Sequence, residues 1–412
     1  MFTRIGAVAL KKDLHNTIAM CEALGNPQHQ FKSVHIAGTN GKGSTSHMLA
    51  AIFQKAGYKT GLYTSPHLKD FRERIRINGE MVPEEFVTSF VASQQTLIEE
   101  ISPSFFEVTV AMAFSFFAKE KVDIAIIEVG LGGRLDSTNI IKPELSVITN
   151  ISLDHTNILG NTLPAIASEK AGIIKPHVPV VIGESQPEVA QVFLEKATET
   201  ESIISFADQR IQVKNLRRKT MLLADVYQNG ELCYPDLELD LTGGYQRKNL
   251  ATVIQSVSVL TEMGYEVDTP SLYNALKDVK NLTGLQGRWQ ILNDNPLTIC
   301  DTGHNIGGIT EVMQNINDTP HDQLHIVIGM VRDKDINGVL ALLPTDAHYY
   351  FCQPQLERGL PAQELAAQAA QHHLVGDVFP TIALAIQTAK DNAAVNDLIF
   401  IGGSTFVVAE AL

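Results

Sequence analysis

The chain has 412 residues, of which 44% are hydrophobic and 19% charged, and its formal net charge is −14. This composition is typical of a folded protein, the length favours two domains over one, and the acidic balance argues against a nucleic-acid partner. We expect a cytoplasmic protein without a membrane partner, because the cysteines are scattered and form no disulfide pattern. The N-terminal apolar run is also too short for a signal peptide, and no apolar stretch is long enough to cross a membrane.

The first predicted strand is FKSVHIAG, residues 31–38, and a helix follows the glycine-rich segment at residues 38–44. The helix is apolar at Met48, Leu49, Ile52 and Phe53, and Gly57 is expected to end it. The next segment, KTGLYTS, is typical of a second strand. This order predicts a βαβ unit.

Further apolar runs continue the pattern. A helix is predicted over FFEVTVAMAFSFFAKEK, followed by strands in VDIAIIEVG, LSVITNI and VPVVIGE. Continuous apolar strands are typical of a parallel sheet that is buried on both faces. Between Arg210 and Leu241 the residues alternate instead, and the pair Asn229-Gly230 indicates a hairpin, which predicts a small antiparallel appendage.

A second α/β series begins near Arg288. The segments PLTICD, LHIVIGMV, AHYYFCQP and LIFIGG are strand-like, and PAQELAAQAAQHHL is helical. The segment NLTGLQGR, residues 281–288, has two glycines and is the best linker candidate. We therefore predict two α/β domains, residues 1–286 and residues 287–412.

The glycine-rich segment lies between a strand and a helix, where a phosphate-binding loop belongs. Its glycines free backbone N–H groups, and the helix N-terminus adds positive potential. The spacing departs from the general G-x-x-x-x-G-K-[ST] pattern, because Ile36 occupies the first glycine position and Gly43 separates Lys42 from Ser44. Spacing alone leaves a plain glycine-rich turn with a surface lysine as an alternative.

A basic stretch follows the second strand. Within YTSPHLKDFRERIRINGE lie Lys69, Arg72, Arg74 and Arg76. These cations are placed to gather an anionic ligand at the carboxyl ends of the strands. A solvated edge hairpin is the alternative, and the residues alone do not choose between them.

Acidic residues and histidines stand at other predicted strand ends. Glu128 follows a buried strand, where a carboxylate is suited to Mg²⁺. Asp154 and His155 follow the next strand, but a lone histidine is more often structural, so the residues leave His155 undecided.

The second domain also presents polar strand ends. Asp301, His304 and Asn305 follow one predicted strand, and Lys334 follows the next. Helix capping is the alternative for Asp301 and Asn305. Polar loops in both domains predict a cleft between them.

At this point four long segments, in order, resemble the signatures of the folylpolyglutamate synthases, which include bifunctional dihydrofolate synthases and belong to the Mur ligase superfamily. The segments are GTNGKGS, SPHLKDFRERIRING, EVGLGGRLDSTN, and ITNISLDHTNILG with IASEKAGIIK. The extra glycine at position 43 matches the family's own loop. The resemblance implies a P-loop-type ATPase domain and a smaller Rossmann-like C-terminal domain in a monomer.

The same resemblance implies a reaction. The γ-phosphate of ATP passes to a substrate carboxylate, and the amine of L-glutamate displaces phosphate from the resulting acyl phosphate. The expected acceptors are tetrahydrofolate, whose glutamate chain is extended, and dihydropteroate.

Roles are carried over onto the matching positions. Lys42, Lys170 and His304 are the implied catalytic residues, with Lys170 carbamylated. Mg²⁺ is implied at Ser65, Glu128 and His155. The implied substrate positions are Phe106, Glu107, His304 and Ser404, with glutamate at the last two. The implied ATP contacts are Gly38, Thr39, Asn40, Gly41, Lys42, Gly43, Ser44, Asn249, Arg288 and Asp301.

Some positions depart from the family pattern, notably Tyr245, where the family usually has histidine. Two other functions stay open. A Mur-type ligase for another carboxylate is disfavoured because few residues precede the loop, too few for a further domain. A non-catalytic ATP-binding protein is disfavoured because it does not need the full set of Lys42, Glu128, His155 and Lys170.

Overall fold

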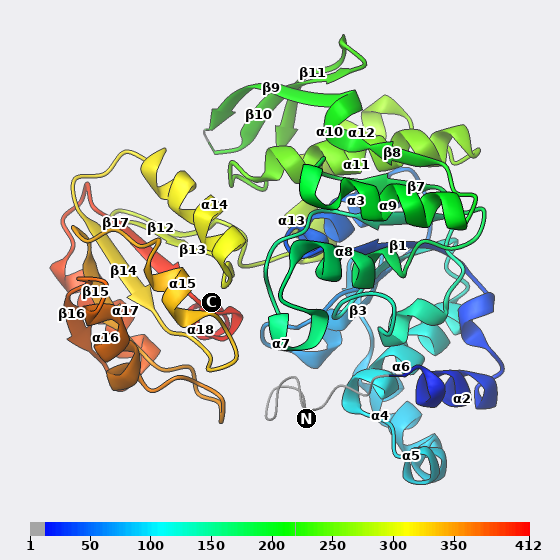
Figure 1. Cartoon of the computed structure of the whole chain (residues 1–412), viewed down its shortest axis with the longest axis horizontal. Coiled ribbons are helices and arrows are strands. Elements are labelled where there is room, and N and C mark those ends of the chain that lie inside the picture. Colours follow the sequence, from blue (N-terminus) through cyan, green and yellow to red (C-terminus); the bar gives the residue numbers. More distant parts are fainter. Residues whose placement is uncertain (1–12, 219) are drawn as a thin grey trace.

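The computed structural model describes residues 13–218 and 220–412, and these form two α/β lobes (Figure 1). The N-terminal lobe is built on an eight-stranded sheet in the order β4-β3-β2-β5-β1-β6-β7-β8, and the C-terminal lobe on a six-stranded sheet in the order β12-β13-β17-β14-β15-β16. Most neighbouring strands in both sheets are parallel. The predicted α/β fold class is confirmed.

The N-terminal lobe extends from α2 to α13. Its strands are β1 (Lys32–Ala37), β2 (Thr60–Tyr63), β3 (Ile75–Ile77), β4 (Glu80–Met81), β5 (Ile124–Glu128), β6 (Leu145–Ile148), β7 (Val180–Ile182), β8 (Ile204–Phe206), β9 (Ile211–Arg218), β10 (Leu222–Gln228) and β11 (Glu231–Leu239). Its α-helices are α2 (His15–Ala23), α3 (Lys42–Lys55), α4 (Glu84–Ser93), α5 (Gln95–Ile101), α6 (Phe105–Glu120), α7 (Thr156–Leu159), α8 (Leu163–Ala171), α9 (Pro187–Glu199), α10 (Ala207–Arg210), α11 (Gln246–Glu262), α12 (Thr269–Leu276) and α13 (Val279–Thr283). Short 3₁₀ turns are η2 (Pro27–His29), η3 (Phe71–Arg74) and η4 (Ser137–Ile140).

The C-terminal lobe extends from β12 to α18. Its strands are β12 (Gln290–Asp294), β13 (Leu297–Cys300), β14 (Leu324–Ile328), β15 (His348–Phe351), β16 (Gly376–Val378) and β17 (Leu398–Gly402). Its helices are α14 (Ile306–Asn317), α15 (Ile336–Leu340), α16 (Ala362–Ala370), α17 (Ile382–Asn392) and α18 (Thr405–Ala411).

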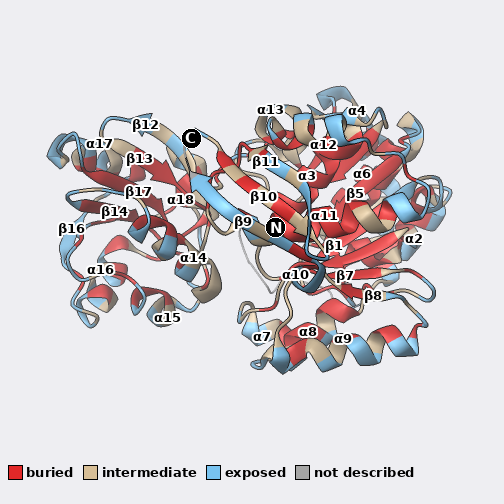
Figure 2. Ribbon diagram, turned by 90° about the horizontal axis from the view of Figure 1, so that it is seen from above, coloured by how far each residue is buried: buried red, intermediate tan, exposed pale blue. Residues whose placement is uncertain are grey.

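The large sheet is apolar on both faces because helices cover both. In β5, Ile124 and Ile126 pack with α3 and α11, whereas Ala125 and Ile127 pack with α6 on the opposite face. This alternation is the period-two geometry of a strand. Figure 2 shows the resulting buried layer through the centre of the lobe.

The predicted antiparallel appendage is the sheet β11-β10-β9. Asn229 and Gly230 connect β10 to β11, and both have positive φ, 51° and 88°, as the tight hairpin turn requires. Val226 and Leu237 pack into the same core as α11. The appendage therefore rests on the helical layer that covers the large sheet.

The predicted linker is shorter than residues 281–288, because its first residues continue α13 to Thr283. Gly284 and Gly287 then both have φ of 70°, and β12 begins at Gln290. The sequence signal for a helix was weak here because α13 has only five residues. The proposed boundary between residues 286 and 287 stays a prediction. Within the described ranges no helix is long and apolar enough to cross a membrane.

Two buried histidines predict how stability depends on pH. His35 and His47 hydrogen-bond to Thr138 and Thr283, and burial lowers the pKa of each histidine to about 3. Their pKa values in the unfolded chain are near 6.5, so unfolding takes up protons below that pH. The free energy of unfolding is expected to fall, as pH falls from about 6.5 towards 3, by about 1.4 kcal/mol per pH unit for each histidine.

Urea unfolding of a His35→Gln variant checks this expectation. Relative to the unmodified protein, the free energy of unfolding of the variant should rise by about 1.4 kcal/mol for each pH unit below about 6. His177→Gln is the matched control, because the His177 side chain is 69% exposed. Parallel stability curves for the His35 variant and the unmodified protein would contradict the assignment.

Candidate active site

A cavity of about 360 Å³ lies where the two lobes meet. Both lobes line it, and the carboxyl ends of β1, β2, β5 and β13 open onto it. Every residue that the sequence analysis assigned to the site lies on its wall: Gly38, Thr39, Asn40, Gly41, Lys42, Gly43, Ser44, Ser65, Phe106, Glu107, Glu128, His155, Lys170, Asn249, Arg288, Asp301, His304 and Ser404. The structure thus brings the predicted residues together, while their individual roles stay predictions.

The glycine-rich loop wraps around the ammonium group of Lys42. The loop leaves β1 at Gly38, and α3 begins at Lys42, whose Nζ donates to the carbonyls of Gly38 and Thr39 at 3.1 Å each. Thr149 Oγ1 donates to the Asn40 carbonyl at 2.6 Å and ties the loop to β6. Lys42 is therefore held at the cavity, at a helix N-terminus, rather than extended on the surface as in the alternative reading.

Gly38 makes this loop possible, which gives a second testable prediction. Its φ is 145°, and an added Cβ would overlap the hydroxyl of Thr149. We expect Gly38→Ala to weaken ATP binding by at least roughly tenfold, because the loop must move away from Thr149. Titration calorimetry with ATP measures this.

Gly57→Ala is the matched control for Gly38. Gly57 also has positive φ, 93°, but no atom lies within 4 Å of the point that an added Cβ would occupy. The control should lose about 1 kcal/mol of stability from backbone strain alone and keep its ATP affinity. Equal ATP affinities in all three proteins would contradict the role of the loop.

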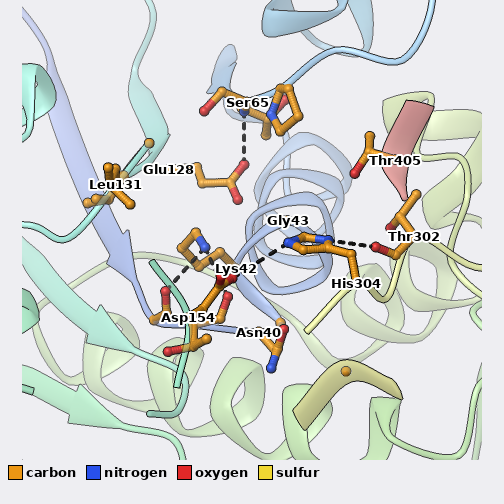
Figure 3. Close-up of a pocket in the computed structure, with 18 of the residues that line it drawn as sticks. Asn40, Lys42, Gly43, Ser65, Glu128, Leu131, Asp154, Thr302, His304 and Thr405 are labelled. Carbon is orange, nitrogen blue, oxygen red and sulfur yellow. Dashed lines mark hydrogen bonds and ion pairs between the residues drawn. The ribbon is translucent and has the colours of Figure 1, made fainter. Parts of the chain in front are cut away.

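Glu128 offers the cavity a buried carboxylate. It ends β5, is 4% exposed, and accepts a hydrogen bond from the backbone N–H of Ser65 at 3.1 Å (Figure 3). Burial raises the pKa of Glu128, and the nearby Lys42 opposes that shift. The carboxylate with the Ser65 hydroxyl is an oxygen donor set of the kind that holds Mg²⁺ together with substrate phosphates.

His155 is the third predicted metal ligand. Burial lowers its pKa to about 4, which keeps the imidazole neutral as a ligand must be, and its φ of 50° lies in the left-handed region. Its Nε2 lies 3.2 Å from Lys334 Nζ. Within the described ranges no three His, Cys, Asp or Glu side chains form a metal cage. The residues fit a cation that also takes ligands from the substrates, rather than one held by protein alone.

Lys170 is buried, contrary to the alternative of an ordinary helix lysine. It lies in α8, is 4% exposed, and its Nζ donates to the Gly38 carbonyl at 2.8 Å. Burial and, secondarily, the positive charge of Lys42 lower its pKa to about 7. A large fraction of the amine is therefore neutral and nucleophilic near neutral pH.

Asp154 and Lys334 link the lobes across the cavity. Lys334 Nζ donates to Asp154 Oδ1 at 2.7 Å, and Asn305 Nδ2 donates to Asp154 Oδ2 at 2.9 Å. His304 Nε2 lies 3.6 Å from Asp154. Burial raises the pKa of Asp154, but His304 and Lys334 together hold it well below its usual range. Asp154 and Lys334 stand at predicted strand ends, but no site role is predicted for them from the sequence, because no local spacing connects them.

Asp301 organises the other wall of the cavity. Its Oδ2 accepts from Tyr245 Oη at 2.6 Å and from the Trp289 backbone N–H at 2.7 Å. Arg288 donates to Thr302, next to Asp301. Tyr245 thus connects α11 of one lobe to β13 of the other.

Asn249 lies on α11 beside the glycine-rich loop. It donates to Gln246 Oε1 at 2.8 Å, and Gln246 donates to Ser44 Oγ at 3.2 Å. An added Cβ on Gly41 would overlap the Asn249 side chain. Asn249 therefore backs the loop at Gly41, as Thr149 does at Gly38.

An aromatic wall closes the cavity near α6. An added Cβ on Gly130 would overlap the Phe106 ring, so the two are in direct contact. Phe105 packs edge-on against Phe71 at 5.7 Å between ring centroids. Glu107 is 2% exposed and accepts from the Ser104 N–H at 2.5 Å as part of the helix cap. Aromatic faces beside a carboxylate suit a flat heterocycle with N–H donors.

Ser404 and His304 belong to the wall contributed by the C-terminal lobe. Ser404 caps α18 by accepting from the Phe406 N–H at 3.2 Å, which also gives it a structural role. In Figure 3, His304, Thr302 and Thr405 face Glu128 and Leu131 of the N-terminal lobe. Groups from both lobes thus converge on one space.

Two family models match the chain. Residues 36–257 match the Mur ligase middle domain, and residues 287–405 match the Mur ligase glutamate ligase domain. The chain is 32% identical to the dihydrofolate synthase/folylpolyglutamate synthase of Bacillus subtilis, covering 94% of this chain and 91% of that protein. The chain spans about half the length of two other relatives. One of them is a probable bifunctional folylpolyglutamate synthase/dihydropteroate synthase of Haloferax volcanii, to which the chain is 31% identical over 46% of that protein's length.

Solved structures agree with this relationship. The structure of E. coli FolC in complex with DHPP and ADP matches with a TM-score of 0.88 at 30% identity, over 98% of this chain and 93% of that one. A bifunctional folylpolyglutamate synthase/dihydrofolate synthase with Mn, AMPPNP and L-glutamate bound matches with a TM-score of 0.84 at 30% identity, over 98% and 94% of the two chains.

Proposed function

The chain belongs to the folylpolyglutamate synthase and dihydrofolate synthase family of the Mur ligases, and from this we propose that it is an ATP-dependent ligase joining L-glutamate to folates. Its acceptors are tetrahydrofolate, in chain extension, and dihydropteroate. The relatives with DHPP and ADP, and with Mn, AMPPNP and L-glutamate, support these substrates. An amide ligase for an unrelated carboxylate and a non-catalytic ATP-binding protein are thereby disfavoured.

One observation carries the proposal. A single cavity places the phosphate loop, the carboxylate of Glu128, the amine of Lys170 and the aromatic wall at Phe106 around one space. A carboxylate becomes an acyl donor only when one of its oxygens becomes a good leaving group. Phosphorylation by ATP supplies that leaving group, and the protein then contributes position and charge.

In the first step a carboxylate oxygen of the folate attacks the γ-phosphorus of ATP, the bond to ADP breaks, and an acyl phosphate forms. Lys42 and the loop N–H groups hold the phosphates and stabilise the negative charge that develops. Arg288, Asn249 and Asp301 bind the nucleotide between the lobes. The family's Mg²⁺, when bound at Glu128, Ser65 and His155, supplies charge neutralisation for the phosphates.

In the second step the amine of L-glutamate attacks the acyl carbon, the new C–N bond forms, and inorganic phosphate leaves with a proton lost from the amine. His304 and Ser404 position glutamate from the C-terminal lobe. The ion pair between Asp154 and Lys334 holds that lobe against the segment between β6 and α7. Lobe contact thus brings the amine to the acyl phosphate.

Lys170 is carbamylated in this proposal. The neutral amine attacks CO₂, an N–C bond forms, and one proton is released, so the lysine becomes an anion. The low exposure and lowered pKa of Lys170 favour the neutral amine that this reaction requires. The positive charge of Lys42 would then attract the carbamate rather than repel the ammonium.

Three further predictions belong to the proposal: a monomeric state, a cytoplasmic location and no nucleic-acid partner. The proposal is tested by ATP- and Mg²⁺-dependent incorporation of labelled L-glutamate, with tetrahydrofolate and dihydropteroate offered separately. Incorporation with both acceptors is expected. Incorporation with neither, while ATP still binds, would refute the folate assignment.

A further inference from the structure

The basic stretch after β2 is divided by the fold. Lys69 is exposed, and Arg72 forms ion pairs with Asp70 and Glu84 outside the cavity. Arg74 and Arg76 instead line the cavity. The 3₁₀ turn η3 ends at Arg74 and β3 starts at Ile75, so Arg74 is the last residue of the turn and Arg76 lies in the strand.

Arg74 belongs to the cavity wall and is held in place by its neighbours. It is 6% exposed, its Nε donates to His67 Nδ1 at 2.8 Å, and its guanidinium lies 5.6 Å from the centre of the Phe105 ring. Burial lowers the pKa of Arg74, which means that the fold holds a cation where water solvates it poorly. Such a cation is costly unless an anion accompanies it.

Arg76 stands beside it. Its Nη1 donates to the Gly79 carbonyl at 2.8 Å, and its guanidinium packs against Gly284 at the entrance to the interlobe linker. Both Arg76 and Arg288 lower the pKa of His47 in α3, whereas Arg74 acts on Glu128 at the end of β5. The two arginines therefore line the same cavity as the aromatic wall and Glu128, with Arg74 next to Phe105.

Carboxylates act on this pair from beyond ion-pair distance: Glu128 and Glu73 partly offset the lowering of the pKa of Arg74, and Glu73, Glu80 and Asp70 partly offset that of Arg76. In the described parts of the chain, no carboxylate forms an ion pair with Arg74 or Arg76. Glu73 is engaged by the backbone N–H groups of Leu68, Lys69 and Asp70, and Glu128 by the N–H of Ser65 and the charge of Lys42. A chain with a net charge of −14 thus keeps two cavity-lining guanidinium groups that have no carboxylate of the described residues within ion-pair distance.

The two proposed acceptors differ in the anions they bring. Dihydropteroate has one carboxylate, which must reach the phosphate of ATP. A folate that already carries glutamate reacts through its terminal γ-carboxylate and brings at least one additional α-carboxylate. Guanidinium groups bind carboxylates through charge-assisted, often bidentate hydrogen bonds.

We propose that Arg74 and Arg76 form a subsite for the non-reacting α-carboxylates of the glutamyl chain, and that this subsite selects glutamylated acceptors. The inference rests on the proposed function. The two arginines thus act in chain extension, whereas the first glutamylation, that of dihydropteroate, does not use them.

The test compares Arg76→Met with the unmodified protein on two acceptors that differ in one group. One is tetrahydrofolate, and the other is its analogue with γ-aminobutyrate in place of glutamate, which keeps the reacting carboxylate and lacks the α-carboxylate. Arg76→Met should raise the KM for tetrahydrofolate roughly tenfold to a hundredfold. The KM for the analogue should not change, and kcat should fall less than KM rises.

Arg72→Met is the matched control, because it removes a guanidinium from the same stretch outside the cavity. Arg76→Lys keeps the charge and should recover part of the lost affinity. Equal losses on both acceptors, or no loss on either, would overturn the subsite. If the unmodified protein glutamylates neither acceptor, the proposed function fails first and the subsite falls with it. Thermal melting of each variant shows that the comparison uses folded protein.

Discussion

Replacing Lys42 by alanine is expected to lower kcat by at least roughly a thousandfold. The ammonium group of Lys42 lies 3.1 Å from two carbonyls of the phosphate loop, those of Gly38 and Thr39. Phosphoryl transfer depends on charge stabilisation and position, so removing this group removes stabilisation of the transition state. Steady-state kinetics of glutamate incorporation measure the effect.

The matched control is Lys55→Ala. Lys55 is exposed at the C-terminal end of the same helix, α3, and does not line the cavity. Its substitution should leave kcat unchanged. Both variants should melt near the temperature of the unmodified protein, since neither residue belongs to the apolar core. If Lys42→Ala kept more than a tenth of the activity, the mechanism assigned to the loop would be wrong.

Replacing Lys170 by alanine is expected to lower kcat roughly a hundredfold to a thousandfold, because the carbamate and its negative charge are lost. The effect should be partly reversed by a small carboxylate such as acetate, which can occupy the space of the missing carbamate. Lys170→Arg should be as inactive as Lys170→Ala, because a guanidinium does not react with CO₂ and stays charged. Carbon NMR in ¹³C-bicarbonate should show a carbamate only when Lys170 is present.

The pH dependence of carbamylation follows from the same lysine. Its pKa is lowered from about 10.5 to about 7, so the amine is protonated and unreactive well below pH 7. The carbamylated fraction at fixed CO₂ should therefore rise as pH rises through about 7. A carbamate signal that persists in Lys170→Ala, or an active Lys170→Arg variant, would contradict this assignment.

Most of the fold was predictable because its strands are buried on both faces. The segments around β1, β5, β6 and β7 are continuous apolar runs, and such runs are hard to mistake when glycines and helical periods separate them. Strand order was not predictable, because β5 lies between β1 and β2 through contacts distant in sequence. Short elements such as α13 carry too few residues for a periodic signal.

Residues contributed by one segment were easier to predict than contacts between segments. The phosphate loop is continuous, so Lys42 could be assigned from its neighbours. The pairing of Asp154 with Lys334 joins positions 180 residues apart, and no local sequence pattern predicts it. The buried Lys170 donates to the carbonyl of Gly38, 132 positions away in the sequence, which no local pattern predicts. The division of the basic stretch at Arg74 depends on one 3₁₀ turn.

The most direct test of the central claim follows the oxygen atoms of the acceptor. Tetrahydrofolate labelled with ¹⁸O in its γ-carboxylate is incubated with the protein, ATP, Mg²⁺ and L-glutamate, and the released phosphate is analysed by mass spectrometry. An acyl phosphate predicts one ¹⁸O atom transferred to phosphate for each amide formed. Amide formation with unlabelled phosphate would contradict the mechanism, and no amide formation would contradict the assigned function.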